Sequence, residues 1–360
     1  MNLTDVINAL VEEQGLAREK VISIVCEGVK AAYEKKFPQY DFKISFNLSS
    51  GEIEVFTIKI VSDPAKNKEK EISPKKAQIV SPKAKINQKI DVPFEGKIGR
   101  VEISTAKQVI ALKIREIEQL ATYEEFIDKK GTIVSGTIHK RERRGVAIKI
   151  DDVIGFLPTS NSIPNEILTP GNPIRVQVKE VYQIPVGGHQ VILDRASSEF
   201  IKNLLEIEIP EIFEGIIEVK GIARNAGYKT KIIVSSHSKE IDPIGTCVGV
   251  RGSRIKPILK ELGQEKIDLI EETGDKEKLI KQSLKPAEID KVELSDNQRA
   301  TVWLAEDQRS LAIGKMGQNI SLAARLTGVE INLQELINEK KSTKSEEETN
   351  TVKEEPEENS

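Results

Sequence analysis

Residues 242–263 read DPIGTCVGVRGSRIKPILKELG and residues 307–328 read DQRSLAIGKMGQNISLAARLTG, so the chain contains one pattern twice. In each copy an Asp opens the stretch, a G-x-x-G interrupts it, and a helix-like run with one apolar face ends at a Gly. Extended runs precede and follow both copies. The repeat therefore predicts a strand, a helix, a glycine-bounded turn, a second helix and a strand, used twice. The repeated positions are Asp242, Gly249, Gly252, Ile255 and Gly263, which return as Asp307, Gly314, Gly317, Ile320 and Gly328.

This order of elements, in duplicate, is the plan of a tandem KH module, which clamps about four nucleotides of single-stranded RNA at each G-x-x-G loop. A glycine at each edge of the loop removes a Cβ atom where a phosphodiester backbone must come close. A helix N-terminus follows the loop, and its free N–H groups favour a phosphate. A single copy would be explained more simply as a turn between two helices. Two copies in register, with matching flanks, favour RNA binding.

The residues between the glycines support the same interpretation. They are Val250-Arg251 in the first loop and Lys315-Met316 in the second, so each loop carries one cation and no carboxylate. In the first copy, Arg254 and Lys256 follow about one helical turn later. Basic or neutral residues at these positions suit a loop that approaches phosphates.

Residues 131–197 contain five strand-like runs separated by turn residues, which predicts a small closed barrel of the OB type. The opening GTIVSGTIHKRERRGVAIKI follows the S1 variety of that barrel. Its KRERR segment is the densest arginine cluster of the chain and could guide an RNA backbone, although a solvated hairpin tip explains it equally well in isolation. S1 barrels stack bases on aromatic side chains, and here mainly Phe156, with His139, is available. We therefore expect weak RNA binding by the barrel alone.

The first 130 residues predict helices, a hairpin and a long final helix. Alternating apolar residues in 42–61 indicate the hairpin, and the lysine-rich, proline-punctuated stretch 64–89 is expected to be exposed loop with a short strand. A long helix is predicted from Thr105, where Thr105 and Gln108 have capping-box spacing, to a point near Gly131.

Composition sets the outer limits of function. The 360 residues carry a formal net charge of −3. Residues 339–360 contain eight Glu and four Lys, so the remainder carries −3 − (−4) = +1. No apolar run approaches the roughly 20 residues of a membrane span, and the acidic N-terminal helix does not resemble a signal peptide. Cys26 and Cys247 stand far apart without the spacing of a zinc site, so a reducing cytoplasm is expected.

The order of these segments resembles the NusA family of bacterial transcription factors. EIEIPEIFEGIIEVKGIARNAGYKTKIIV followed by DPIGTCVGVRGSRI is similar to the family's first KH domain, and RSLAIGKMGQNISLAARLTG is similar to its second. The stretch AKQVIALKIREIE resembles the family's helix into the barrel. The resemblance covers roughly residues 1–338. It implies a multidomain α+β chain made of an N-terminal RNA-polymerase-binding α/β domain with a long connecting helix (1–130), an S1 barrel (131–197), two KH domains (198–275 and 276–340) and a disordered Lys/Glu tail (341–360).

The resemblance also implies function and partners. The N-terminal domain would bind RNA polymerase and the S1–KH–KH part would bind nascent single-stranded RNA, which modulates pausing, intrinsic termination and antitermination. Other Nus factors and a ribosomal protein are implied partners, and a monomer is expected. Polymerase contacts are placed by position at Arg18, Lys20 and Glu27. The expected RNA-binding residues are Gly249, Val250, Arg251, Gly252, Arg254 and Lys256 in the first KH domain, Gly314, Lys315, Met316, Gly317, Gln318 and Asn319 in the second, and, on charge and ring chemistry, Lys140, Arg141, Arg143, Arg144 and Phe156 in the barrel.

Nothing in the sequence indicates catalysis, a cofactor or a metal. The three histidines are scattered, and no P-loop or nucleophile elbow is present. Asp242 and Asp307 are expected to cap their helices. Polynucleotide phosphorylase also carries KH and S1 domains, but in the opposite order and behind catalytic domains that this chain lacks. A KH protein of ribosome assembly or translation is the stronger alternative, because it differs only in what the N-terminal domain contacts.

Overall fold

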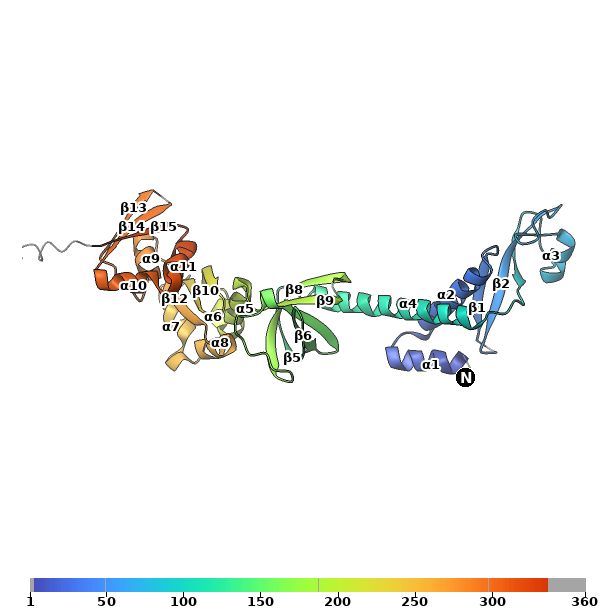
Figure 1. The fold of residues 1–360 in the computed structure, drawn as a ribbon, viewed down its shortest axis with the longest axis horizontal. Helices are drawn as coiled ribbons and strands as arrows, with labels where there is room; N and C mark the ends of the chain where they lie inside the picture. Colours follow the sequence, from blue (N-terminus) through green and yellow to red (C-terminus); the bar gives the residue numbers. More distant parts are fainter. Residues whose placement is uncertain (1–2, 49, 187, 297, 336–360) are drawn as a thin grey trace, which may run out of the picture. The chain divides into compact units, whose positions relative to one another are not determined.

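The structure is a computed structural model that describes residues 3–48, 50–186, 188–296 and 298–335. The predicted tail, 341–360, and the last residues of the predicted second KH domain lie outside these ranges. The chain divides into two compact units, residues 1–124 and 125–360, and Figure 1 draws the elements of both. Among the described helices, none combines the length and the apolar character needed to cross a membrane.

The first unit packs helices against a small sheet. In the sheet β2 pairs with β1, β3 and β4, and the predicted hairpin is confirmed by the antiparallel register that places Ile44 opposite Val55. Buried residues of α2 recur at helical spacing, and a Cβ on Gly28 would lie 2.5 Å from Ile110 of α4, so glycine allows these helices to approach closely. The elements are α1 (Leu3–Gln14), α2 (Arg18–Lys36), β1 (Phe42–Asn47), β2 (Glu52–Val61), β3 (Glu71–Ile72), α3 (Pro74–Val80), β4 (Lys89–Pro93) and α4 (Arg100–Ile127).

Two local predictions for this unit are wrong. Helix α4 begins at Arg100, and Thr105 lies inside it, where its hydroxyl donates to the Val101 carbonyl at 3.2 Å. The helix start is instead stabilised by Glu102, whose carboxylate accepts a hydrogen bond from the Gly99 N–H at 2.7 Å. That bond is the main reason why the pKa of Glu102 lies below its usual value. The short strand predicted in 64–89 is β3, but the rest is not all exposed loop, because the stretch also contains helix α3, which Pro74 opens at a first-turn position that suits proline.

The second unit begins with a closed five-stranded barrel, which confirms the predicted strands. The strands close in the order β5-β6-β7-β9-β8, and Ile138, Ile148, Leu157, Val176 and Leu193 fill the interior. Strands with alternating inward and outward side chains can enclose such a core without leaving an unpaired edge. The elements are β5 (Ile133–Glu142), β6 (Gly145–Ile150), β7 (Val153–Pro158), a 3₁₀ turn (Thr159–Asn161), β8 (Pro173–Val186) and β9 (His189–Asp194).

Two modules follow with the same order of elements from their first strand onward, as the repeat predicts, and the first module has one additional short helix before its sheet. Each has a three-stranded sheet whose first two strands are antiparallel and whose last two are parallel. The first module comprises α5 (Ser198–Glu208), α6 (Pro210–Phe213), β10 (Ile217–Asn225), β11 (Lys229–Ser236), α7 (Pro243–Val248), a 3₁₀ turn (Val250–Gly252), α8 (Ile255–Leu262) and β12 (Lys266–Glu271). The second comprises α9 (Lys276–Ser283), β13 (Lys291–Asp296), β14 (Arg299–Leu304), α10 (Glu306–Ile313), a 3₁₀ turn (Lys315–Gly317), α11 (Gln318–Thr327) and β15 (Glu330–Glu335).

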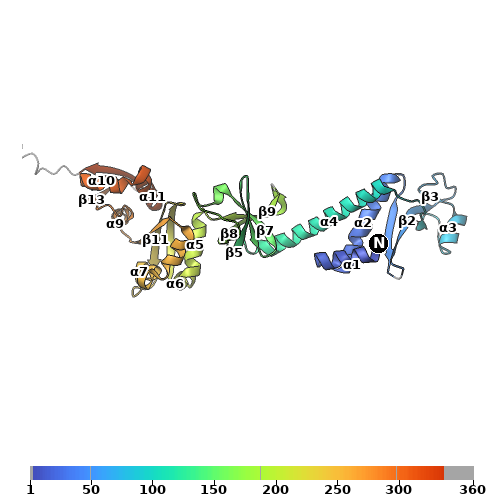
Figure 2. The same cartoon turned by 60° about the horizontal axis from the view of Figure 1, so that its bottom comes forward.

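The two faces of the first module's sheet contact different neighbours. Ile232 and Val234 of β11 join the core formed with α5 and α8. Figures 1 and 2 draw the helices and strands of this module from two directions. Since side chains alternate along a strand, Ile233 points to the other face. A Cβ on Gly221 of β10 would lie 3.6 Å from Leu326 of α11 and 3.8 Å from Ile233, so α11 of the second module packs there.

The two predicted helix caps have different outcomes. The Asp242 carboxylate accepts the Ile244 N–H at 3.0 Å and caps α7, as predicted. Asp307 does not cap α10, because the helix begins at Glu306 with Ala305 as its N-cap. Asp307 instead lies in the first turn, where a negative charge still favours the helix dipole.

Candidate nucleic-acid interface

The two G-x-x-G loops have nearly the same backbone conformation. The φ angles of the two glycines are 73° and 78° at Gly249 and Gly252, and 71° and 74° at Gly314 and Gly317. The first glycine of each loop has ψ of 168° or 178°, a region that only glycine adopts readily. The residue before the second glycine is left-handed in both loops, with φ of 54° and 53° at Arg251 and Met316. The sequence repeat is therefore a repeat of loop geometry.

The side chains at the loop tips project into solvent. Val250 is 83% exposed and Met316 is 87% exposed, although both are apolar. Arg251 and Lys315 are exposed as well, and no ion pair involves either of them within the described ranges. Each loop thus presents one apolar side chain and one free cation beside a backbone without Cβ atoms at its edges. That surface suits the sugar-phosphate chain of a nucleic acid.

Two of the predicted RNA-binding residues are used to hold the loops in place. Arg254 donates to the Thr246 carbonyl at 2.9 Å and to the Glu211 carboxylate at 2.9 Å. Asn319, at the same position in the second copy, is 4% exposed and its Nδ2 donates to the carbonyls of Leu311 and Ala312 at 3.3 and 3.2 Å. Both side chains tie the loop to the last turn of the preceding helix. We therefore treat them as positioning residues.

Two other predicted residues lie beside these anchors. Lys256 of α8 is exposed, whereas Gln318 of α11 is half-buried. Lys256 therefore projects a charge toward solvent at the start of the helix that follows its loop, whereas Gln318 at the start of α11 is uncharged.

The first glycine of the second loop should be far more sensitive to alanine than a glycine with a similar φ elsewhere in the module. A Cβ on Gly314 would lie 2.7 Å from the Asn319 Cβ, in addition to the strain of its backbone conformation. We expect Gly314→Ala to lower the free energy of unfolding by about 3 kcal/mol. Gly328→Ala is the matched control, since φ there is 69° and nothing lies within 4 Å of its Cβ. It should cost about 1 kcal/mol. Urea denaturation measures both unfolding free energies. If the two variants lost the same amount of unfolding free energy, the close packing of Gly314 against Asn319 would be contradicted.

The barrel brings together only part of its predicted site. Arg143 and Arg144 are exposed at the turn between β5 and β6. Arg141 is partly used by the fold, because its Nε donates to the Leu168 carbonyl at 3.1 Å. Lys140 lies 3.2 Å from Glu142, and its hydrogen bond is the largest influence that lowers the pKa of that carboxyl.

Phe156 has a partner that the sequence did not reveal. Its ring stacks on His189 of β9, with centroids 4.1 Å apart and planes inclined by 10°. His189 Nε2 in turn lies 3.1 Å from the Glu142 carboxylate. No local pattern predicts this pair, since β7 and β9 become neighbours only when the barrel closes. Phe156, which is half-buried, is therefore one ring of a stacked pair rather than a lone ring on the barrel surface.

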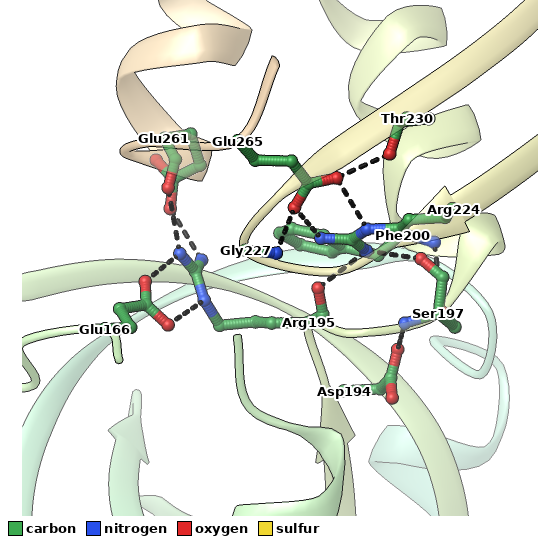
Figure 3. Close-up of polar contacts among 10 residues, drawn as sticks. All are labelled: Glu166, Asp194, Arg195, Ser197, Phe200, Arg224, Gly227, Thr230, Glu261 and Glu265. Atoms are coloured by element: carbon green, nitrogen blue, oxygen red, sulfur yellow. Dashed lines mark hydrogen bonds and ion pairs between the residues drawn. The ribbon is translucent and has the colours of Figure 1, made fainter. Parts of the chain in front are cut away.

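The barrel is joined to the first module by buried arginines that sequence reasoning did not single out (Figure 3). Arg195, 1% exposed on its side chain, bonds the carboxylates of Glu166 and Glu261, the latter at 2.6 Å. Arg224 makes a bidentate pair with Glu265, both bonds 2.9 Å, and also donates to the Arg195 carbonyl at 2.8 Å. The ring of Phe200 lies 5.2 and 5.9 Å from the two guanidinium groups. Because every charge in this cluster is paired, it joins the two parts in a defined orientation.

The two modules are also joined by polar contacts. Arg325 of α11 donates to the Arg224 carbonyl at 3.2 Å. Lys231, fully buried, donates to Asp268 at 2.9 Å and to the Lys285 carbonyl at 3.3 Å. Burial lowers the pKa of Lys231. Burial also acts to raise the pKa of Asp268, but hydrogen bonds from Lys229 and Lys231 outweigh it and hold that pKa below its ordinary value.

The predicted polymerase contacts all lie on the exposed surface of α2. Arg18, Lys20 and Glu27 are exposed, whereas the apolar residues between them face the core of the first unit. Side chains in these positions can contact another protein, but their positions do not identify that protein.

A closed barrel followed by two modules with bare, glycine-edged loops defines a multidomain RNA-binding protein. Three family models match the chain: the NusA N-terminal domain over residues 2–120, the NusA-like first KH domain over 195–272 and the NusA-like second KH domain over 276–341. The chain belongs to the NusA family of transcription termination/antitermination proteins.

Similar proteins extend over nearly the whole chain. A NusA transcription termination/antitermination protein of Bacillus subtilis is 34% identical over 334 residues, which covers 92% of this chain and 90% of the relative. That of Thermus thermophilus is 33% identical over 339 residues, or 90% of this chain and 87% of the relative. The solution structure of the N-terminal domain of the B. subtilis protein matches with a TM-score of 0.27 at 30% identity, over 32% of this chain and 96% of that structure. As a member of the family, the chain is a non-catalytic transcription factor.

Proposed function

We propose that the first unit binds RNA polymerase while the barrel and the two KH domains bind the nascent transcript, so that the protein modulates pausing, intrinsic termination and antitermination. The observation that carries the RNA-binding part is the pair of loops with one backbone geometry, each with an unpaired exposed cation. We assign the barrel to the S1 type on its five-strand closure and its stacked Phe156–His189 pair. The protein would act as a cytoplasmic monomer, with other Nus factors and a ribosomal protein as partners.

Weak individual contacts are sufficient for this function. Each module holds only a few nucleotides, but once one loop has bound, the next engagement is intramolecular and occurs at a high effective concentration. Arg195 bonds Glu261 of the first KH domain and Arg224 donates to the Arg195 carbonyl, and these bonds between barrel and first KH domain limit the freedom that binding would otherwise remove. Binding to the polymerase would raise the local concentration of transcript further. The protein can therefore bind free RNA weakly and still act during elongation.

The polymerase assignment can be tested without RNA. We expect immobilised full-length protein to retain purified bacterial core RNA polymerase after ribonuclease treatment, because the contact is assigned to the first unit. A chain lacking residues 1–124 should lose that retention and keep its affinity for single-stranded RNA, because the boundary between the two compact units follows Glu124. Retention of ribosomal particles in place of polymerase by the full chain would favour the ribosome-assembly alternative and discard the transcriptional assignment.

A further inference from the structure

The lysine-rich stretch 64–89 of the first unit is strongly basic and lies outside the contacts named so far. It contains eight Lys and two Glu, a net charge of 8 − 2 = +6. All eight lysines are exposed, and within the described ranges none of them forms an ion pair. One of the two glutamates is used by the fold, because the Glu71 carboxylate accepts the N–H groups of Lys66 and Asn67 at 2.6 and 3.1 Å. The positive charge of this stretch is therefore not neutralised by the described chain.

The lysines are carried by a folded surface rather than by a loose loop. Helix α3 lies beside the end of β2 (Figures 1 and 2). Its Ala77 packs with Val61 of β2 and Ile90 of β4 in a small buried core. The segment after the helix is fixed as well, since the Asn87 N–H donates to the Val61 carbonyl at 2.8 Å. A backbone that is already ordered loses less entropy when a partner binds.

Aliphatic side chains stand among these lysines and are exposed to solvent. Ile79 is 83% exposed, and Val80 and Ile86 are 40% and 62% exposed. Because an α-helix has about 3.6 residues per turn, Lys75 and Ile79 project from the side of α3 opposite Ala77, next to each other. Several exposed apolar groups within a strongly charged surface are typical of a site that another molecule covers.

The composition of this surface favours a polypeptide over a nucleic acid. Residues 64–89 contain no Phe, Tyr, Trp or Arg. A base therefore finds no aromatic ring on which to stack, and a phosphate finds no guanidinium for paired hydrogen bonds. Exposed aliphatic side chains are stabilised by burial against other apolar groups, whereas the lysines attract carboxylates. An acidic segment that also carries aliphatic residues is complementary to both features.

We propose that α3 and the segment after it bind an acidic segment of a partner polypeptide, whose aliphatic side chains cover Ile79 and Ile86. This contact goes beyond the RNA and polymerase binding proposed above, because it adds a second protein contact to the first unit, on α3 rather than on α2. It also leaves both G-x-x-G loops free for RNA. The site, here called the α3 surface, consists of Lys75, Lys76, Ile79, Lys83, Lys85 and Ile86.

The test uses the full-length protein and two labelled peptides of about 14 residues. In the first, Leu recurs at helical spacing and Glu and Ala fill the other positions, so that an acidic helix with one apolar face forms. In the second, Ser replaces every Leu. We expect fluorescence anisotropy at low salt to show at least about fivefold tighter binding of the Leu peptide by the wild type.

Two variants separate the charged from the apolar part of the α3 surface. The double reversal Lys75→Glu, Lys76→Glu should weaken the Leu peptide about tenfold, because it replaces attraction by repulsion. Ile79→Ser should weaken the Leu peptide about fivefold and leave the Ser peptide within about twofold of wild type, because it removes only apolar contact.

Each variant has a matched control in the second unit. Lys276→Glu, Lys278→Glu reverses two exposed lysines of α9, and Ile167→Ser replaces an isoleucine that is also 83% exposed. Both controls should keep their affinity for the two peptides within about twofold of wild type. Unchanged melting temperatures show that all the variants are folded.

The same proteins decide between an acidic polypeptide and other partners. The double reversal should keep its affinity for single-stranded RNA and its retention of core RNA polymerase, because those contacts are placed on the loops and on α2. If it lost polymerase, or if it weakened RNA as much as the Leu peptide while Ile79→Ser changed neither, a separate polypeptide site would be excluded. Tighter binding to phosphatidylglycerol vesicles than to the Leu peptide would identify a membrane surface instead. If the wild type showed no preference for the Leu peptide, the proposal would be overturned, whereas the RNA and polymerase assignments would stand.

Discussion

Replacing Val250-Arg251 and Lys315-Met316 by Asp-Asp is expected to abolish binding of single-stranded RNA while the melting temperature shifts by no more than about 2 °C. The substitution removes two cations and adds four carboxylates, a change of −6 in charge at the two sites where we place phosphates. At least a 100-fold loss of affinity should follow, because both loops are lost together and neither can tether the strand for the other. Fluorescence anisotropy with a labelled RNA measures the loss.

The same variant should stay folded for a conformational reason. Arg251 and Met316 are left-handed, with φ near 54° and 53°, and Asp tolerates that region better than most residues. Val250 and Met316 are among the most exposed side chains of the chain, so no core is disturbed. Asn at all four positions is the matched control, since it tolerates the same backbone without charge. Wild-type affinity in the Asp variant would show that these loops do not hold the RNA.

The repeated modules and the barrel could be predicted because their signals are local. Alternating apolar residues, helical spacing and glycine pairs each report on a few neighbouring residues, and the β11–α7–α8–β12 order follows from them directly. The sequence alone misplaces the start of α4, because Thr105 and Gln108 match a capping pattern whereas Glu102 provides the actual cap. Helix α3 is hard to predict because prolines and lysines dominate its neighbourhood, although Pro74 suits a first helical turn.

The chemistry of individual side chains was harder to predict, because it depends on distant partners. Arg254 looks like a phosphate ligand in the sequence, but the fold brings Glu211 of α6 to within 2.9 Å of it. Phe156 meets His189 only through barrel closure. The Arg224–Glu265 pair joins residues on β10 and after α8 that no short motif relates. Sequence patterns thus predict the candidate interface, whereas the structure distinguishes its exposed residues from those that hold the loops in place.

Removing one partner of the Arg224–Glu265 pair should have the largest effect on stability of any single change at the junction. The two side chains are 2% and 0% exposed, so Glu265→Ala leaves a buried guanidinium without its counter-charge. It also removes the acceptor of the Gly227 N–H and of the Thr230 hydroxyl. We expect the second unit to lose about 3–5 kcal/mol of unfolding free energy. In calorimetry of the full chain, its transition should fall by about 10 °C.

Two controls distinguish the buried charge from a general loss of contacts. Arg309 pairs with Glu335 at 2.7 Å, but both side chains are nearly half exposed, so Arg309→Ala should cost less than about 1 kcal/mol. The double variant Arg224→Met, Glu265→Leu removes both charges and keeps much of the volume, and it should be more stable than Glu265→Ala alone. If the double variant were as unstable as the single one, the cost would come from the lost hydrogen bonds to Gly227, Thr230 and the Arg195 carbonyl. In that case the junction would be stabilised by these hydrogen bonds rather than by the attraction between the two charges.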